Sequence, residues 1–318
     1  MTARWLIGLI WLLGLWPFCR ADDVPAMTLQ QVGPHSYYVQ GLAAAGSGAN
    51  QNFISNAGFV VGPQGVVLID ALGSPVLAER LLQLIRDVTP KPVTHVILTH
   101  YHADHIYGLQ VFKALGAQII AQRSAQEYIH SETAQQRLQD SRISLAPWID
   151  EDTRLVPPDR WIDGATTLTL AGVTFRIDVV GPSHTPEDIT VYVPDEKVLF
   201  CGDLIFSGRL PFVGKADSSH WISALDHLLQ YDTRQIVPGH GPASGDAHKD
   251  IRFVRGYLVY LRSSMSKAAQ ELTPFDEAYD QTDWSRFEHV PMFRYANRMN
   301  AYNTYLLLEQ AGGASPER

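Results

Sequence analysis

Three histidines and one aspartate fall within six consecutive residues, and side chains of these types bind transition metals. His100, His102, Asp104 and His105 follow directly after an apolar segment, 93–98, that has the pattern of a buried strand. Imidazole nitrogens and carboxylate oxygens are common ligands of Zn²⁺ in proteins. Side chains at i and i+2 of an extended backbone point the same way, so His100 and His102 can bind one ion together. The segment therefore predicts a metal site, with zinc as the expected metal.

The second half of this cluster begins a predicted helix. Apolar residues recur at helical spacing from Ile106 to Leu115, directly after Asp104 and His105. The turn from strand to helix points this second pair of side chains in a new direction. The sequence therefore allows a second metal ion beside the first.

Three later apolar segments each lead into a turn that carries one more potential ligand. Glycine or proline lies beside each ligand, and these residues favour tight turns and close approach of the backbone. Loops on a rigid scaffold are the usual location of catalytic groups. The same setting at four strand ends argues against a chance cluster of surface histidines. The three further ligands are His184, Asp203 and His240.

The first 21 residues have the pattern of a secretory signal peptide. Arg4 precedes an almost unbroken apolar run from Trp5 to Phe18, which is short for a membrane span. Ala21 suits the position before a cleavage site. We expect residues 1–21 to be removed, which places the mature chain in the periplasm or outside the cell, with no stable membrane span. An uncleaved N-terminal anchor is the alternative.

The composition of the remaining chain restricts its partners. Without residues 1–21 the chain has 23 basic and 33 acidic residues, a net charge near −10. No basic run remains, so nucleic acid is not an expected partner and a small-molecule substrate is. Cys201 would be the only cysteine, so no internal disulfide can form and packing and metal must hold the core.

The chain divides into a mixed region and a helical tail. Residues 22–246 contain two β-rich halves with helices between them, which predicts two packed sheets covered by helices, an α+β fold. After residue 246 helical spacing replaces the strand pattern. We therefore expect a catalytic domain over residues 22–246 and a helical C-terminal extension over residues 247–318. The predicted strands include 52–61, 198–200 and 235–237, and 125–149 is predicted to be mostly helical.

The motif His-x-His-x-Asp-His with its three downstream ligands resembles the metallo-β-lactamase fold superfamily. The resemblance covers residues 29 to about 245 and fills all seven ligand positions. It implies an αβ/βα four-layer sandwich with the site at one edge, where the two halves meet. It also implies two Zn²⁺ ions, one held by His100, His102 and His184, the second by Asp104, His105 and His240, with Asp203 bridging them.

Asp70 follows the predicted strand 66–69 and matches a recurring acidic position of the superfamily. A metal-bound imidazole nearly always donates its other nitrogen to a carboxylate, a carbonyl or water. We expect Asp70 to accept such a hydrogen bond from a ligand or its loop. A simple turn aspartate is the alternative.

The resemblance implies a hydrolase. Two zinc ions would generate hydroxide near neutral pH and polarise a carbonyl oxygen, and the metal-bound hydroxide would attack the carbonyl carbon. Asp104 and Asp203 are then the catalytic carboxylates, since Asp104 orients the nucleophile and Asp203 bridges the ions. A bridging aspartate resembles the glyoxalase II-like thioesterases and lactonases, which favours an ester, thioester or lactone substrate.

Other activities use the same scaffold. A metallo-β-lactamase that hydrolyses β-lactam antibiotics is the first alternative, although zinc β-lactamases generally have Cys, or no bridging ligand, near the position of Asp203. An iron-dependent sulfur dioxygenase is the second, because such enzymes keep the histidine set. The flavodi-iron branch replaces the second histidine by Glu, so His102 argues against it. A metal-binding accessory protein of an electron-transfer system is a non-catalytic alternative.

The chain also resembles a narrower group, the secreted quinoprotein relay system zinc metallohydrolases. The resemblance lies in residues 206–211, in residues 217–221 and in the aromatic tail. Members of that group are associated with periplasmic quinoprotein dehydrogenases, so such a dehydrogenase is an expected partner. Arg209, in the first segment, is a candidate contact for a substrate anion, with a surface ion pair as the alternative. His220, in the second, is a candidate pocket residue, with capping of the following helix as the alternative.

Overall fold

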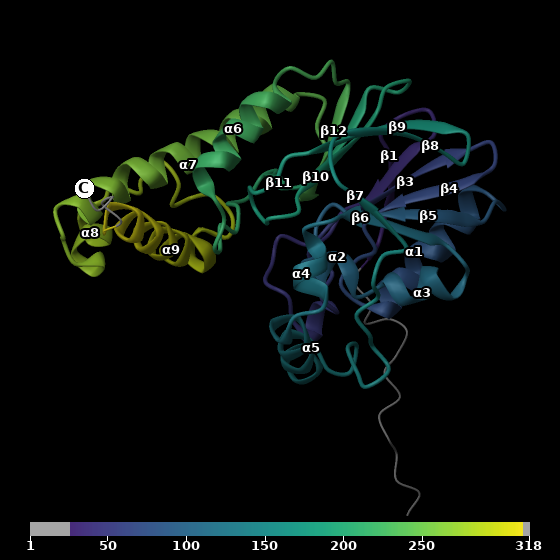
Figure 1. Cartoon of the computed structure of the whole chain (residues 1–318), viewed down its shortest axis with the longest axis horizontal. Helices are drawn as coiled ribbons and strands as arrows, with labels where there is room; N and C mark the ends of the chain where they lie inside the picture. Colours follow the sequence, from purple (N-terminus) through teal and green to yellow (C-terminus); the bar gives the residue numbers. More distant parts are fainter. Residues whose placement is uncertain (1–25, 314–318) are drawn as a thin grey trace, which may run out of the picture.

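Two β-sheets packed face to face form the centre of the protein, and helices cover the outer face of each (Figure 1). The computed structural model describes residues 26–313, so the predicted signal peptide lies outside the described residues. The layers run helices, sheet, sheet, helices. This order confirms the predicted αβ/βα four-layer sandwich and the α+β class.

Within residues 26–313 the larger sheet has seven strands in chain order, namely β1 (Leu29–Gln31), β2 (Ser36–Val39), β3 (Ala57–Gly62), β4 (Gly65–Ile69), β5 (Val93–Ile97), β6 (Gln118–Gln122) and β7 (Arg160–Ile162). Strands β1 to β4 pair antiparallel, and β4 to β7 pair parallel. Parallel neighbours need crossover connections, several of which contain helices. Because β4 and β5 are parallel, Asp70 and His100 follow them at the same edge of the sheet.

The smaller sheet has, in the described part of the chain, the strands β8 (Thr166–Leu170), β9 (Val173–Val179), β10 (Ile189–Val193), β11 (Val198–Phe206) and β12 (Gln235–His240). Strands β8 to β11 pair antiparallel, and β11 pairs parallel with β12. Strands β9, β11 and β12 therefore run in one direction. Their carboxyl ends meet at one edge, which is where His184, Asp203 and His240 lie.

Helices on the outside of the larger sheet are α1 (Pro75–Val88), α2 (Ala103–Ile106), α3 (Leu109–Ala114), α4 (Ala125–Ile129) and α5 (Glu132–Ser144). Helix α1 illustrates why they pack there. Proline occupies its first turn, where no amide hydrogen is needed. Leu77, Leu81 and Ile85 recur at helical spacing and are buried against the sheet.

Helices on the outside of the smaller sheet are α6 (Ser218–Leu228), α7 (Ala247–Gln270), α8 (Phe275–Gln281) and α9 (Phe293–Gly313). The last three confirm the predicted helical C-terminal extension, and they form an arm that reaches away from the sheets (Figure 1). Buried side chains of α7 share one apolar core with α6 and β11. Within residues 26–313 no helix is both long enough and apolar enough to cross a membrane.

The two inner sheet faces are joined by an apolar core. Phe200 of β11 is 2 % exposed and lies in this core with Val67, Ile97 and Val191. Its ring fits against Gly58 of β3, where a Cβ atom would lie 2.2 Å from the ring. The missing side chain at this position therefore sets how closely the two sheets approach.

Several predicted boundaries are wrong, and local hydrogen bonding explains the largest error. The strand predicted over 52–61 begins only at Ala57, because Gln51 and Asn52 have φ angles of 56° and 62°. The side-chain oxygen of Asn50 accepts a hydrogen bond from the backbone nitrogen of Asn52, which favours a turn over a strand. A 3₁₀ turn, η2 (Gly48–Asn50), precedes it.

Other boundaries differ near the predicted ligands. Strands β11 and β12 continue beyond the predicted 198–200 and 235–237 and contain Asp203 and His240, with register shifts between the pairs. The segment 125–149 is mostly helical, as predicted, but it contains two helices separated by a turn, and the second helix ends at Ser144. The distorted pairing of β11 and β12 lets both ligands leave the regular pleat.

We expect Phe200→Ala to lower the free energy of unfolding by about 3–5 kcal/mol, because it leaves a cavity between the sheets. Ile143→Ala is the control: Ile143 is 82 % exposed on α5, and surface changes alter stability by about 0.5 kcal/mol or less. Urea denaturation at fixed metal content measures both. Equal losses in the two variants would contradict the described packing of Phe200.

Candidate metal centre

The structure brings all seven predicted ligands together at the edge where the two sheets meet. They come from the ends of β5 and β9, from β11 and β12, and from the short helix α2. The ligand atoms form two groups, and within each group they lie within 4.8 Å of one another. The first group is His100, His102, His184 and Asp203, and the second is Asp104, His105 and His240.

Asp203 lies between the two groups. Its Oδ2 atom is 3.3 Å from Nε2 of His184 and 3.2 Å from Nε2 of His240. Its Oδ1 atom is 3.2 Å from Nε2 of His105. One carboxylate thus faces imidazoles of both groups, which is the position that a bridging ligand would need.

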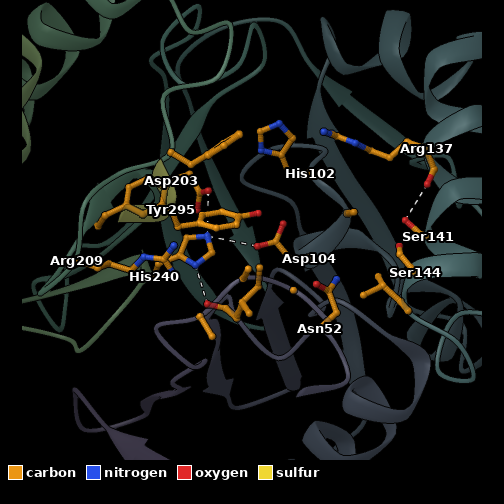
Figure 2. Close-up of a pocket in the computed structure, with 18 of the residues that line it drawn as sticks. Asn52, His102, Asp104, Arg137, Ser141, Ser144, Asp203, Arg209, His240 and Tyr295 are labelled. Atoms are coloured by element: carbon orange, nitrogen blue, oxygen red, sulfur yellow. Dashed lines mark hydrogen bonds and ion pairs between the residues drawn. The ribbon is translucent and has the colours of Figure 1, made fainter. Parts of the chain in front are cut away.

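The remaining contacts define each group. In the first, Nε2 of His184 is 3.0 Å from Nδ1 of His102. In the second, Oδ2 of Asp104 is 3.4 Å from Nε2 of His240 (Figure 2). The same oxygen is 3.6 Å from Nε2 of His105. Imidazole and carboxylate groups this close, with few other donors among them, are arranged as metal ligands are.

Several of these atoms are buried without a hydrogen-bond partner among the described residues. They are Nε2 of His100, Nε2 of His105 and Oδ1 of Asp203. An unpartnered buried polar atom costs free energy, and proteins rarely leave several in one place. A cation in each group would satisfy them, so the residues present fit two metal ions.

Burial and charge set the protonation of the cluster. Burial lowers the pKa of His100 and His102 well below the usual value, which favours the neutral imidazole that binds metal. Burial also lowers the pKa of His105, but carboxylates, Asp203 foremost, outweigh it and raise that pKa well above normal. Burial opposes ionisation of Asp203, yet the imidazoles around it, with His240 first, hold its pKa well below normal.

Asp70 lies directly behind the second group. Its Oδ2 atom is 2.9 Å from Nδ1 of His105, and its two oxygens accept hydrogen bonds from the backbone nitrogen and hydroxyl of Thr99, both at 2.8 Å. A proton held on Nδ1 leaves Nε2 of His105 free to face the cluster. The structure thus places Asp70 where the predicted hydrogen bond would form.

A backbone carbonyl does the same for His240. The carbonyl oxygen of Ile54 accepts a hydrogen bond at 2.7 Å from Nδ1 of His240. Sequence reasoning missed this contact, because a backbone oxygen has no residue signature. Asn56, two residues further along, donates to the carbonyls of Pro238 and Gly241 and so fixes the turn around His240.

The glycine before His240 is required by close packing. A Cβ atom at Gly239 would lie 2.0 Å from Oδ1 of Asp203. Any side chain there would displace the carboxylate between the two groups. The glycine at 239 is therefore explained by the close approach of β12 to β11.

A cavity of about 280 Å³ opens on the ligands (Figure 2). Arg209 lines this cavity, which is where its predicted contact with a substrate anion would have to form, and burial lowers the pKa of its guanidinium. His220 does not line it: its side chain is exposed on α6, and the Asp217 carboxylate accepts a hydrogen bond from its backbone nitrogen. Neither interpretation of His220 holds, because the residue that caps α6 is Asp217 and the side chain of His220 does not line this cavity.

Two cavity residues were not predicted from the sequence. Tyr295 reaches the cavity from α9, and Arg137 reaches it from α5 (Figure 2). Both lie far in sequence from the ligand motifs, and neither belongs to a motif. Only the packing of the two helices brings them to the site.

Comparison with known proteins agrees with this geometry. Residues 51–240 match the family model described as "Metallo-beta-lactamase superfamily". The chain belongs to this superfamily. Its relatives include "Linear primary-alkylsulfatase" from Pseudomonas sp. (strain ATCC 19151), 26 % identical over 235 residues, covering 63 % of this chain and 44 % of the relative. "Metallo-beta-lactamase type 2" from Bacteroides fragilis is 26 % identical over 196 residues, covering 60 % and 70 %.

Solved structures share the fold. The stereoselective inverting sec-alkylsulfatase Pisa1 from Pseudomonas sp. superposes with a TM-score of 0.72 at 18 % identity, over 92 % of this chain and 52 % of that one. A metallo-beta-lactamase from Pontibacter korlensis gives a TM-score of 0.57 at 21 % identity, over 73 % and 99 %. This chain spans less than half the length of the primary alkylsulfatase. The family match ends at His240, so α7, α8 and α9 lie outside it.

We expect Asp70→Asn to weaken zinc binding by about 10- to 100-fold, because an amide cannot hold the Nδ1 proton of His105 as a carboxylate does. Competition with a chromophoric chelator measures the affinity. Asp87→Asn is the control, since Asp87 is exposed at the end of α1 and bonds only Gln83. An affinity within twofold of the parent would exclude this role for Asp70.

Proposed function

We propose that the protein is a dinuclear zinc-dependent hydrolase that cleaves an ester, thioester or lactone bond. The observation that carries the proposal is the Asp203 carboxylate, which faces imidazoles of both ligand groups. When bound there, two Zn²⁺ ions supply a water of lowered pKa and a Lewis acid for a carbonyl oxygen. Superfamily membership supports hydrolysis.

The side chains around the cavity have separate tasks in this proposal. Asp104 lines the cavity, and its carboxylate is more exposed than that of Asp203. It can therefore orient an attacking water and accept its proton. Asp203 is buried and holds the two groups in register. The apolar ring of Phe206 forms part of the wall and limits access of bulk water.

The choice of bond rests on the bridging residue. Aspartate at this position resembles the thioesterases and lactonases of the superfamily more than the zinc β-lactamases. The first alternative, β-lactam hydrolysis, is supported by the relative from Bacteroides fragilis. The name of the Pseudomonas relative adds alkyl sulfate esters as a second candidate substrate class. An iron-dependent sulfur dioxygenase is distinguished by its metal.

We also propose that the protein acts in the periplasm, beside a quinoprotein dehydrogenase system. The signal-like residues 1–21 support export to the periplasm. The segments around Arg209 and Trp221 support the link to a quinoprotein dehydrogenase, because they resemble the quinoprotein relay system group. Cell fractionation with N-terminal sequencing of the exported chain tests the first part. Co-purification with the dehydrogenase from the native host tests the second.

A substrate panel with metal analysis tests the activity. We expect purified protein to contain about two zinc ions per chain and to hydrolyse an aryl ester, a thioester or a lactone. The panel also contains a chromogenic cephalosporin and an alkyl sulfate. Turnover of the cephalosporin alone at ordinary enzyme rates would replace the proposal by the β-lactamase alternative. One iron per chain without hydrolysis would support the dioxygenase.

We expect Asp104→Asn to lower kcat about 100-fold or more on the best substrate of the panel, because the amide cannot accept a proton and is a weaker ligand for the second ion. His100, His102 and His184 remain, so the first ion should stay bound. The matched control is Asp140→Asn, an exposed carboxylate on α5. Steady-state kinetics with metal content per chain give the result, and unchanged kcat at full metal content would remove Asp104 from the mechanism.

A further inference from the structure

Arg209 is a buried cation that forms no direct ion pair among the described residues, although Asp203 and Asp104 lie near enough to act on its charge. Arg209 is only 5 % exposed, and its Nε and Nη1 atoms have no hydrogen-bond partner in residues 26–313. No carboxylate of the described chain lies within ion-pair distance of its guanidinium. Charged groups are rarely buried without a partner, because losing water is costly for them. Asp203 and Asp104 stabilise this charge only from beyond ion-pair distance, so donors of the guanidinium remain open to an anion in the cavity.

The guanidinium faces the cavity beside the metal-ligand groups. Arg209 lines the cavity together with Asp203 and His240 (Figure 2). Its Cζ atom lies 5.8 Å from the ring centroid of Phe206, a cation–π contact that restricts its position. An anion bound to Arg209 would thus lie next to the reacting bond.

The C-terminal extension fixes the segment that carries Arg209. The backbone nitrogen of Leu210 donates to the carbonyl of Pro291 at 3.0 Å. The fully buried side chain of Asn300 accepts from the backbone nitrogen of Val213 at 2.9 Å and donates to the carbonyl of Pro211 at 2.8 Å. Three hydrogen bonds therefore hold this segment on α9 and the residues before it.

The same helix also supplies a wall of the cavity. Tyr295, less than two turns before Asn300 on α9, lines the cavity on the side of Arg209 (Figure 2). Both functions of α9 come from residues outside the 51–240 family match. Arg209 itself lies inside the match, but the residues that hold its segment in place lie outside it.

We propose that Arg209, positioned by the C-terminal extension, binds an oxyanion of the substrate, a carboxylate or a sulfate group, beside the metal centre. A guanidinium presents two parallel N–H donors, which match the oxygens of such groups. The proposal rests on the proposed hydrolase function for its biological meaning. It narrows the substrate class to anionic molecules whose charged group lies close to the bond that is cleaved.

Arg137 provides a matched control on the opposite wall (Figure 2). It also lines the cavity, and none of its donors bonds a carboxylate of the described residues, but its side chain is exposed. Water screens an exposed charge, so its contribution to anion binding should be small. Arg137→Gln and Arg209→Gln change the net charge equally and differ in burial.

Calorimetry on the metal-loaded full-length protein tests the proposal with hexanoate, hexyl sulfate and neutral hexanamide as probes. We expect at least one anion to bind tighter than hexanamide by about tenfold or more, the effect of a charge-assisted hydrogen bond. Arg209→Gln should abolish this preference at unchanged metal content, and Arg137→Gln should preserve it. Whichever of hexanoate and hexyl sulfate binds with the higher affinity shows whether the site prefers a carboxylate or a sulfate group.

Hexanoate has no bond that the panel tests, so its binding is independent of whether the panel substrates are hydrolysed. The hexyl sulfate titration is read together with an assay for released sulfate. An anion preference that survives Arg209→Gln would overturn the proposal, because the metal ions would then be the anion site. Equal affinity for the anions and hexanamide would also overturn it. If Arg209→Gln loses metal, Arg209→Lys decides at full metal content, because lysine cannot offer two parallel donors. A weakened anion preference supports the proposal, and an unchanged preference contradicts it.

Discussion

The structure depends on one buried carboxylate that must stay charged between two groups of imidazoles. Asp203 has almost no access to water, and the field of the surrounding histidines keeps it ionised. Those histidines come from both sheets, so the charge is stabilised only when the sheets are packed. Three features help to hold Asp203 against these histidines. They are the core around Phe200, the glycine at 239 and the bulged pairing of β11 with β12.

Much of the centre could be predicted from the sequence, because its ligands are side chains of distinctive type at strand ends. The histidine motif, Asp203 and His240 are such cases, and the layered fold follows from alternating strands and helices. Other parts could not be predicted. The Ile54 carbonyl has no residue signature, and Tyr295 reaches the cavity only through the packing of α9. The start of β3 was missed because side-chain bonds of Asn50 favour a turn.

In the proposed function, catalysis and substrate selection rest on different parts of the molecule. The ligands lie on strand ends of the superfamily fold, where small shifts would break several contacts at once. Much of the cavity wall comes instead from residues 44–54, from α5 and from the segment around Arg209, with Tyr295 from α9. This separation explains how relatives named as lactamases and alkylsulfatases can share one framework. It also explains why the ligand set alone leaves the substrate open.

The distribution of the ligands along the chain has a consequence for biogenesis. The first and last, His100 and His240, come from opposite sheets, and Asn56 joins the start of β3 to the turn at His240. A chain still lacking β12 therefore presents only an incomplete second group. Metal binding is coupled to folding when the ligands are assembled by the fold. The complete set of seven ligands therefore forms only after both halves of the polypeptide have been translated and packed together.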